Sequence, residues 1–262
     1  MKSAVIIGLG WVGLPTAQAL SSVYNVVQGT VRSTTKQQQL KSIAEPIAIE
    51  LLDLPAAKPT TPIAEPDLGI ICFPPGIRRG PASVYFEKLE TLFSWFKPAH
   101  LLFISSTSVY RNDIDWAFED RRLEQLDSPL VLAEQYVQQQ ITNTAILRFG
   151  GLMGDDRIPA KYFKDQLPKA NHWVNYLHRV DAVRSIVYAA EQQLTGSYNV
   201  CSPEHALKKE VVLDSAQKSG LTAPSQFQET VEQGKRVASD KLIQVGFSYT
   251  FRTPLAFSYQ KV

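Results

Sequence analysis

The sequence predicts a doubly wound α/β fold, in which helices cover both faces of a parallel sheet. Three observations support this prediction. The first apolar segment is interrupted by glycines at the spacing G-x-G-x-x-G, and short apolar runs alternate with helical patterns along the first 150 residues. The run Leu68–Phe73 is apolar without a break, as expected for a strand that is buried on both faces. With 262 residues, 44% of them hydrophobic, the chain can bury a sizeable core.

The opening stretch "VIIGLGWVGLPTAQAL" predicts a strand, a tight turn and a helix. Gly8 would permit the turn, Gly10 would let a pyrophosphate approach the backbone, and Gly13 would let the helix pack against the strand. We expect the helix to run from about Gly10 to Ser21, with its positive N-terminal end facing the phosphates. The predicted dinucleotide-binding residues of this turn are Gly8, Gly10, Trp11, Val12 and Gly13.

The same stretch is also compatible with a signal peptide or a membrane anchor, because it begins near a lysine and has an apolar centre. Glycines destabilise a helix, which argues against a signal peptide, and the stretch is too short to span a bilayer. The two cysteines, Cys72 and Cys201, are far apart and lack metal-ligand spacing. We therefore expect a cytoplasmic protein with reduced thiols, no metal site and no membrane segment.

The elements after the first helix alternate in the way a doubly wound sheet requires. Further strands are expected at Asn25–Val31, Ile47–Leu51, Leu68–Phe73, Leu101–Ile104 and Thr144–Arg148, and helices at Thr34–Ile43, Ser83–Phe96 and Leu123–Ile141. Past Gly150 the pattern loosens, with helices expected at Val180–Gln193 and Lys208–Ser219 and a strand at Ser197–Val200. This predicts an NAD(P)-binding Rossmann domain over residues 1–150. A smaller substrate lobe would cover 151–262, with segments that pack back on the sheet.

The end of the second strand indicates which dinucleotide would bind. NAD sites usually place an acidic residue there, but no acid occurs between Val26 and Lys36. Arg32 and Ser33 stand there instead, and a guanidinium with a neighbouring hydroxyl suits a 2′-phosphate. NADP(H) is therefore favoured over NAD(H), while a merely solvated arginine at the strand end is the alternative. The segment "CFPPG" closes the fourth strand and would border the adenosine half of the cofactor through Cys72, Phe73 and Pro74.

Several later segments resemble one family. "FISSTSVY" at Phe103–Tyr110 places a cluster of hydroxyls at the end of the fifth strand, and "LRFGGLMG", "HRVDAVRSIVYAAE", "GSYNVCS" and "GKRVASDKL" follow it in order. Together they resemble the extended short-chain dehydrogenase/reductase superfamily, in particular its NAD-dependent epimerase/dehydratase group. The resemblance spans nearly the whole chain and is greatest for short, atypical members. It implies a cofactor contact at Ser105 and substrate-holding hydroxyls at Ser106 and Ser108.

The chain departs from the family at the catalytic pair. Members with redox activity use Tyr-x-x-x-Lys, in which tyrosinate is the general base and lysine lowers its pKa. Counting back from Ala133-Glu134 places Leu126 at the tyrosine position and Leu130 at the lysine position. The standard proton relay should therefore be absent. Other groups could replace it, but packing or solvation is the favoured interpretation for each of them: Tyr110, Asp113, Asp115, Glu119, Tyr85 and Tyr162.

Two functions remain open at this point. The first is an NAD(P)-dependent epimerase/dehydratase-like oxidoreductase with a rearranged catalytic site, acting on a small carbonyl compound or a sugar nucleotide. The second is a non-catalytic NADP(H)-binding sensor or regulatory protein, which the missing pair favours. The net charge of +2 demands neither nucleic acid nor an anionic membrane as partner. A homodimer through the helices expected at Ser83–Phe96 and Leu123–Ile141 is compatible with their apolar side chains.

Overall fold

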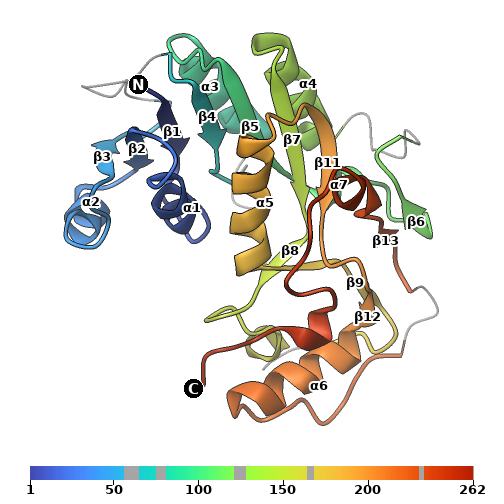
Figure 1. Ribbon diagram of the computed structural model, residues 1–262. Helices are drawn as coiled ribbons and strands as arrows, with labels where there is room; N and C mark the ends of the chain where they lie inside the picture. The colour runs from blue at the N-terminus through green and yellow to red at the C-terminus, as the bar shows by residue number, and fades with distance from the viewer. Residues whose placement is uncertain (56–64, 75–80, 121–127, 164–167, 230–232, 262) are drawn as a thin grey trace. The chain divides into compact units, whose positions relative to one another are not determined.

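The computed structural model describes residues 1–55, 65–74, 81–120, 128–163, 168–229 and 233–261 (Figure 1). The chain forms two compact units. Unit 1 comprises Met1–Ser105, Leu126–Leu147 and Ile186–Ser197, and unit 2 comprises Ser106–Gln125, Arg148–Ser185 and Tyr198–Val262. The chain passes from unit 1 to unit 2 between Leu147 and Arg148. It also crosses at other points, so neither unit is one continuous segment.

A seven-stranded sheet is the central feature, with the strand order β11-β7-β5-β4-β1-β2-β3. Its strands are β1 (Ser3–Ile7), β2 (Val26–Val31), β3 (Ala48–Leu51), β4 (Leu68–Ile71), β5 (His100–Ser106), β7 (Thr144–Phe149) and β11 (Gly196–Val200). β1 pairs in parallel with β2 and β4, as do β2 with β3 and β4 with β5. The predicted doubly wound α/β fold is confirmed. The strand order reverses between β1 and β4, and folds of this kind bind ligands beyond the carboxyl ends of the strands at that point.

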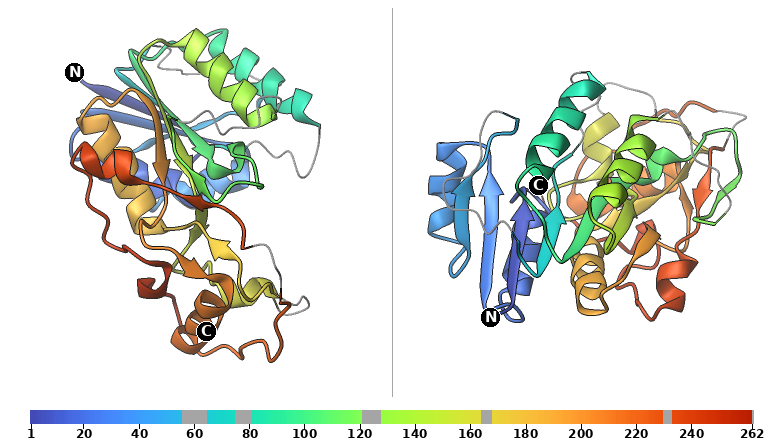
Figure 2. Two further views of the ribbon diagram at one scale, coloured as in Figure 1. Left: turned by 90° about the vertical axis from the view of Figure 1, so that its right-hand side faces the viewer. Right: turned by 90° about the horizontal axis from the view of Figure 1, so that it is seen from above.

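Helices cover both faces of the sheet in unit 1 (Figure 2). They are α1 (Gly13–Leu20), α2 (Thr34–Lys41), α3 (Ala82–Phe93) and α4 (Pro129–Gln140). Successive side chains of a strand point to opposite faces. Val5 and Ile7 of β1 accordingly belong to the core that α3 and α4 close, with Leu89 and Val137. Ile6 points to the opposite face of the sheet, where α1 lies. Its Cγ2 atom is 3.5 Å from the position that a Cβ at Gly13, the first residue of α1, would take.

Unit 2 contains short paired strands and further helices. Its elements include β6 (Trp116–Ala117), β8 (Gly151–Met153), β9 (Trp173–Val174), β10 (Tyr176–His178), β12 (Ala206–Leu207), α6 (Lys208–Ser219), β13 (Arg236–Val237) and α7 (Asp240–Gln244), and α5 (Arg179–Glu191) begins in it. β8 pairs with β10, β9 with β12, and β6 with β13. Val212 and Ala216 of α6 pack with Ile158 in a small core. The bounds of α6 are those expected from the sequence.

Two helices begin later than expected, each for a local reason. α1 begins at Gly13 instead of Gly10, because the amide of Gly10 bonds the carbonyl of Gly8 at 2.9 Å and keeps the chain in a turn. α4 begins at Pro129 instead of Leu123: proline has no amide hydrogen and suits the first helical position, while the Ser128 hydroxyl caps the helix. Within the described residues, no helix is both long and apolar enough to cross a membrane.

Candidate functional site

The glycine turn after β1 is held by the neighbouring strand. The amide of Gly8 donates to the Thr30 hydroxyl at 3.0 Å, and the amide of Leu9 donates to the Thr30 carbonyl at 2.8 Å. Thr30 lies on β2 and is buried, so both acceptors are fixed. The chain therefore sets the conformation of the turn without help from a ligand.

The three glycines of the fingerprint differ in what surrounds them. Gly8 has φ +109°, a conformation that side chains disfavour. A Cβ at Gly13 would overlap the carbonyl oxygen of Gly8, so only glycine lets α1 approach the strand. At Gly10, by contrast, a Cβ would have no heavy atom within 4 Å. The packing of the chain explains two of the glycines, and the third leaves an open, exposed space beside the turn.

The N-terminal end of α1 follows the same turn and has no side-chain cap from its N-cap residue. Val12 is its N-cap residue, makes no side-chain capping bond, and no acidic residue stands in the first turn. The first amides of a helix lack partners within the helix and carry partial positive charge. A diphosphate could accept from the Gly13 amide and occupy the space beside Gly10. The Leu14 amide already donates to the Gly10 carbonyl at 3.1 Å, and Pro15 has no amide hydrogen. The residues present thus fit the phosphates of a dinucleotide.

Arg32 directly follows β2, and its side chain is exposed. None of the carboxylates in the described part of the chain forms an ion pair with it. Ser33 is the N-cap of α2, and its hydroxyl accepts the amide of Lys36 at 3.3 Å, which leaves the hydroxyl hydrogen for another acceptor. Both groups are therefore available to an anion at the end of β2.

The end of β4 lies against the glycine turn. The amide of Cys72 donates to the Ile7 carbonyl at 3.0 Å, and the amide nitrogen of Phe73 lies 3.3 Å from the Cβ position of Gly8. Burial raises the pKa of the Cys72 thiol to about 12, so it stays protonated at neutral pH. Pro74 follows, and its side chain is exposed. The structure thus brings Cys72 and Phe73 to the glycine turn, and their contact with the adenosine half of a cofactor stays a prediction.

Ser105, near the end of β5, donates its hydroxyl hydrogen to Glu134 of α4 at 2.5 Å, and both side chains are buried. Sequence analysis used Glu134 only to locate the helix and did not foresee this pair. Burial, with a contribution from Glu134, raises the pKa of Tyr85 far above its usual value. Tyr85 therefore stays protonated at neutral pH and cannot act as a base. Because the Ser105 hydroxyl hydrogen is donated to Glu134, this hydroxyl can only accept a hydrogen bond from a ligand.

The hydroxyls of Ser106 and Ser108 lie next to each other. The Ser106 hydroxyl donates to that of Ser108 at 3.0 Å and accepts the amide of Ser108 at 3.1 Å. Ser106 thereby caps a short 3₁₀ helix, Thr107–Val109. Ser106 is half-buried and Ser108 is exposed, so the pair offers one fixed hydroxyl and one accessible hydroxyl.

One of the two positions of the missing catalytic pair lies within the described residues, on α4. Leu130 is in the first turn of the helix and is half-buried. Leu126 lies outside the described residues and before the N-cap residue, Ser128. Leucine has no ionisable or hydrogen-bonding group, so the side chain at position 130 cannot act as the family's lysine does.

Tyr110 is fully buried and fixed by two polar partners in unit 2. Its hydroxyl donates to Asn199 Oδ1 at 2.7 Å and accepts from Arg148 Nη1 at 2.9 Å. Burial raises the pKa of Tyr110 to about 12, although Arg148 opposes this rise. The guanidinium carbon also lies 5.1 Å from the centre of the tyrosine ring. These contacts stabilise unit 2 and leave Tyr110 without access to a substrate.

The acidic residues after Tyr110 have partners of their own. Asp113 forms an exposed ion pair with Arg111, and Asp115 accepts two bonds from Arg236 at 2.6 and 2.8 Å. Glu119 accepts a backbone amide of β11 at 2.7 Å, and burial raises its pKa. These partners support the packing and solvation interpretation of the three acids over a catalytic one.

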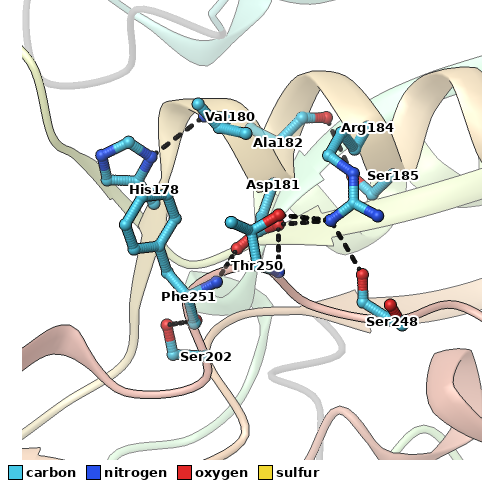
Figure 3. A network of polar contacts seen from close by, with 10 residues as sticks. All are labelled: His178, Val180, Asp181, Ala182, Arg184, Ser185, Ser202, Ser248, Thr250 and Phe251. Atoms are coloured by element: carbon cyan, nitrogen blue, oxygen red, sulfur yellow. Dashed lines mark hydrogen bonds and ion pairs between the residues drawn. The ribbon is translucent and has the colours of Figure 1, made fainter. Parts of the chain in front are cut away.

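The H-x-x-D segment at the start of α5 fixes the C-terminal region of the chain (Figure 3). His178 Nδ1 accepts the amide of Val180 at 3.2 Å, which caps the helix. The buried carboxylate of Asp181 accepts the amides of Thr250 and Phe251, each at 2.8 Å. His178 therefore bonds locally, and the segment has a structural role in unit 2.

Comparison with known proteins gives few sequence relatives and many structural ones. No protein-family profile matches the chain. Protein YeeZ of Escherichia coli K12 is 28% identical over 286 residues, covering 97% of this chain and 98% of its own length. Among solved structures, a functionally unknown conserved protein from Silicibacter pomeroyi superposes with a TM-score of 0.75 and 18% identity, covering 98% and 96% of the two chains.

A UDP-glucuronic acid 4-epimerase from Bacillus cereus, solved in complex with NAD, superposes with a TM-score of 0.73 and 17% identity. The match covers 98% of this chain and 97% of the epimerase. At such identities the similarity concerns the fold. The chain therefore has the fold of NAD-dependent epimerases over nearly its whole length.

Proposed function

We propose that the chain binds a nicotinamide dinucleotide at the glycine turn, with NADP(H) preferred over NAD(H). The observation that carries this proposal is the open space at Gly10, beside the uncapped N-terminal end of α1. A dinucleotide supplies the diphosphate that both features fit. NAD in the Bacillus cereus epimerase of the same fold supports a nicotinamide cofactor.

Different residues of unit 1 would bind different parts of the cofactor. The amides of Trp11, Val12 and Gly13 would hold the diphosphate, while Arg32 and Ser33 would hold a 2′-phosphate. Cys72, Phe73, Pro74 and Ser105 would border the rest of the cofactor. When bound, the cofactor would supply hydride transfer to or from a carbon of the substrate.

We further propose that the protein is an epimerase/dehydratase-like oxidoreductase of the extended short-chain dehydrogenase/reductase type, with an atypical active site. Ser106 and Ser108 would hold a substrate oxygen, because their hydroxyls are adjacent and one is exposed. A sugar nucleotide or small carbonyl compound is the proposed substrate class. The Bacillus cereus epimerase, also solved with UDP-glucuronic acid, supports the former.

A non-catalytic NADP(H)-binding protein is the second candidate. It is favoured by Leu130 at the lysine position and by Tyr110, whose hydroxyl is already bonded to Arg148 and Asn199. Neither side chain can move a proton to or from a substrate. Such a protein would sense the redox state of its cofactor or act through a partner.

Calorimetric titration with NAD⁺, NADH, NADP⁺ and NADPH tests the binding proposal. We expect micromolar dissociation constants for the phosphorylated pair and weaker binding of the other pair. If none of the four bound at millimolar concentration, dinucleotide binding would be refuted. Equal affinities for both pairs would refute only the NADP(H) preference.

A second experiment separates the enzyme from the sensor. NADPH absorbance is followed while the protein is offered a panel of carbonyl compounds and sugar nucleotides. Turnover on any member supports the oxidoreductase, whereas tight cofactor binding without turnover across the panel supports the sensor. The double variant Leu126→Tyr/Leu130→Lys serves as comparison, because gain of activity in it alone would show that the chain still accepts a substrate beside the cofactor.

A further inference from the structure

We infer that unit 2 contains a second anion-binding site, formed by Lys169, His172, Lys208 and Lys235, which takes a phosphate or diphosphate group. The site uses none of the residues of the glycine turn. It therefore does not depend on the proposed binding of a dinucleotide.

Backbone contacts place His172 beside the start of α6 and beside Gly234. The amide of Lys208, the first residue of α6, donates to the His172 carbonyl at 2.8 Å, and the next amide along α6 donates to Ala170 at 3.2 Å. On the other side, Gly234 lies so close to His172 that a Cβ there would overlap the imidazole ring. Lys235 follows Gly234 directly. The imidazole thus lies between the start of α6 and the segment at Gly234 and Lys235.

The lysines of this cluster contact uncharged groups. No ion pair joins Lys169, Lys208 or Lys235 to a carboxylate in the described part of the chain. Lys208 Nζ lies 5.5 Å from the centre of the Phe163 ring. Lys235 Nζ donates to the Tyr110 carbonyl at 2.7 Å and to Asn112 Oδ1 at 2.8 Å. All of these partners are uncharged. Glu210, in the first turn of α6, bonds the amide of its own helix cap instead.

Neighbouring lysines disfavour positive charge on Lys208 and on His172. Burial and Lys169 lower the pKa of Lys208. Burial together with Lys208, Lys169 and Lys235 lowers the pKa of His172. His172 Nδ1 is buried and has no hydrogen-bond partner among the described residues. A bound anion would relieve the repulsion and restore the proton on the imidazole.

A phosphate group fits this cluster better than a single carboxylate. Lysines bind phosphate as compact point charges, and a dianion can pair with ammonium groups that approach from several directions. Lys169 is exposed and the other three residues are half-buried, so an anion can reach them from solvent. Phosphate on a small molecule and free inorganic phosphate share this chemistry.

The experiment uses the full chain and inorganic pyrophosphate as the probe, with malonate as a carboxylate comparison. The histidine Cε1–H signals are followed by NMR over pH; the chain has four histidines, and His172→Gln assigns the signal of interest. We expect pyrophosphate to raise the pKa of His172 and malonate to raise it less. Lys208→Gln should weaken pyrophosphate binding, measured at this signal, about tenfold.

Two further variants make the result specific. Lys41→Gln, at an exposed position in the last turn of α2, removes the same charge and should leave the His172 response unchanged. Gly10→Asp should also leave it unchanged, even if dinucleotide binding is lost. If Lys208→Gln does not fold, Lys169→Gln replaces it. No shift of the His172 signal at millimolar pyrophosphate, or an equal shift in the lysine variants, would overturn the proposal.

Discussion

The carbonyl group of Gly8 fills the space that a side chain at Gly13 would need, with its carbon 3.1 Å from the Cβ position. This places the end of β1 and the start of α1 in direct backbone contact. The helix can approach so closely only because residue 13 has no side chain. The two residues thereby fix where the first amides of α1 stand relative to the turn.

Gly13→Ala should destabilise the fold, because the new carbon overlaps backbone that cannot move aside. Overpacking of this kind costs about 1–3 kcal/mol. Gly10→Ala is the matched control: its Cβ meets open space, so the free energy of unfolding should change little. Urea denaturation followed by circular dichroism measures both. Equal loss in the two variants would contradict the geometry described here.

Gly10→Val should weaken dinucleotide binding while the fold remains intact. The branched side chain would occupy the space proposed for the diphosphate, and we expect at least a tenfold loss of affinity, about 1.4 kcal/mol. Calorimetric titration measures the affinity, and thermal unfolding checks that the variant is folded. Unchanged affinity in a folded Gly10→Val protein would show that the phosphates bind elsewhere.

Arg32→Ala should weaken NADPH binding far more than NADH binding. A charge-assisted hydrogen bond contributes about 1.5–3 kcal/mol, so NADPH affinity should fall by one to two orders of magnitude. Lys41→Ala, which removes the same charge elsewhere in unit 1, is the control and should have little effect on either ligand. Parallel losses for NADPH and NADH would argue against a 2′-phosphate contact.

Thr30→Val should loosen the glycine turn. The substitution keeps the shape of the side chain but leaves the amide of Gly8 without its acceptor, at a cost of about 1–3 kcal/mol. Dinucleotide affinity should fall as well, since the turn loses its fixed conformation. Thr30→Ser keeps the hydroxyl and should retain most of both properties. Comparing the two variants in unfolding and titration experiments isolates the hydrogen bond from the packing.

Stability should fall as the pH drops below about 6.5, in part because of His178. Burial lowers its pKa in the folded protein, and Asp155 and Asp181 only partly oppose this. The unfolded chain then binds the proton more readily than the folded one, so acid favours unfolding. Urea denaturation at pH 7 and pH 5 measures the loss, which should be smaller in His178→Gln. The same pH dependence in both proteins would contradict this role.

The alternation of strands and helices made the order of elements predictable, and α6 was predicted to the residue because Gly220 ends it with φ +75°. The starts of α1 and α4 were wrong. For α4 the sequence contains the needed pattern, since Ser128-Pro129 is typical of a helix cap followed by proline at the first position. For α1 the turn is set by a bond between Gly10 and Gly8, which periodicity does not reveal.

The candidate site was predictable where it depends on local sequence and not where it depends on tertiary contacts. The glycine spacing and Arg32 are visible in the chain itself. The support of Gly8 by Thr30 requires the pairing of β1 with β2, and the bond from Ser105 to Glu134 requires α4 to pack beneath β5. Their partners are 22 and 29 residues apart, so no sequence pattern points to them.

The interleaving of the two units limits how this molecule can have diversified. Since Ser106–Gln125 and Arg148–Ser185 are separated in the chain by residues of the other unit, no single crossover between genes could exchange one unit as a whole. New specificity would have to arise in place, by substitutions and loop insertions within an unbroken reading frame. Laboratory evolution of this protein should accordingly favour scattered mutagenesis over the swapping of contiguous cassettes.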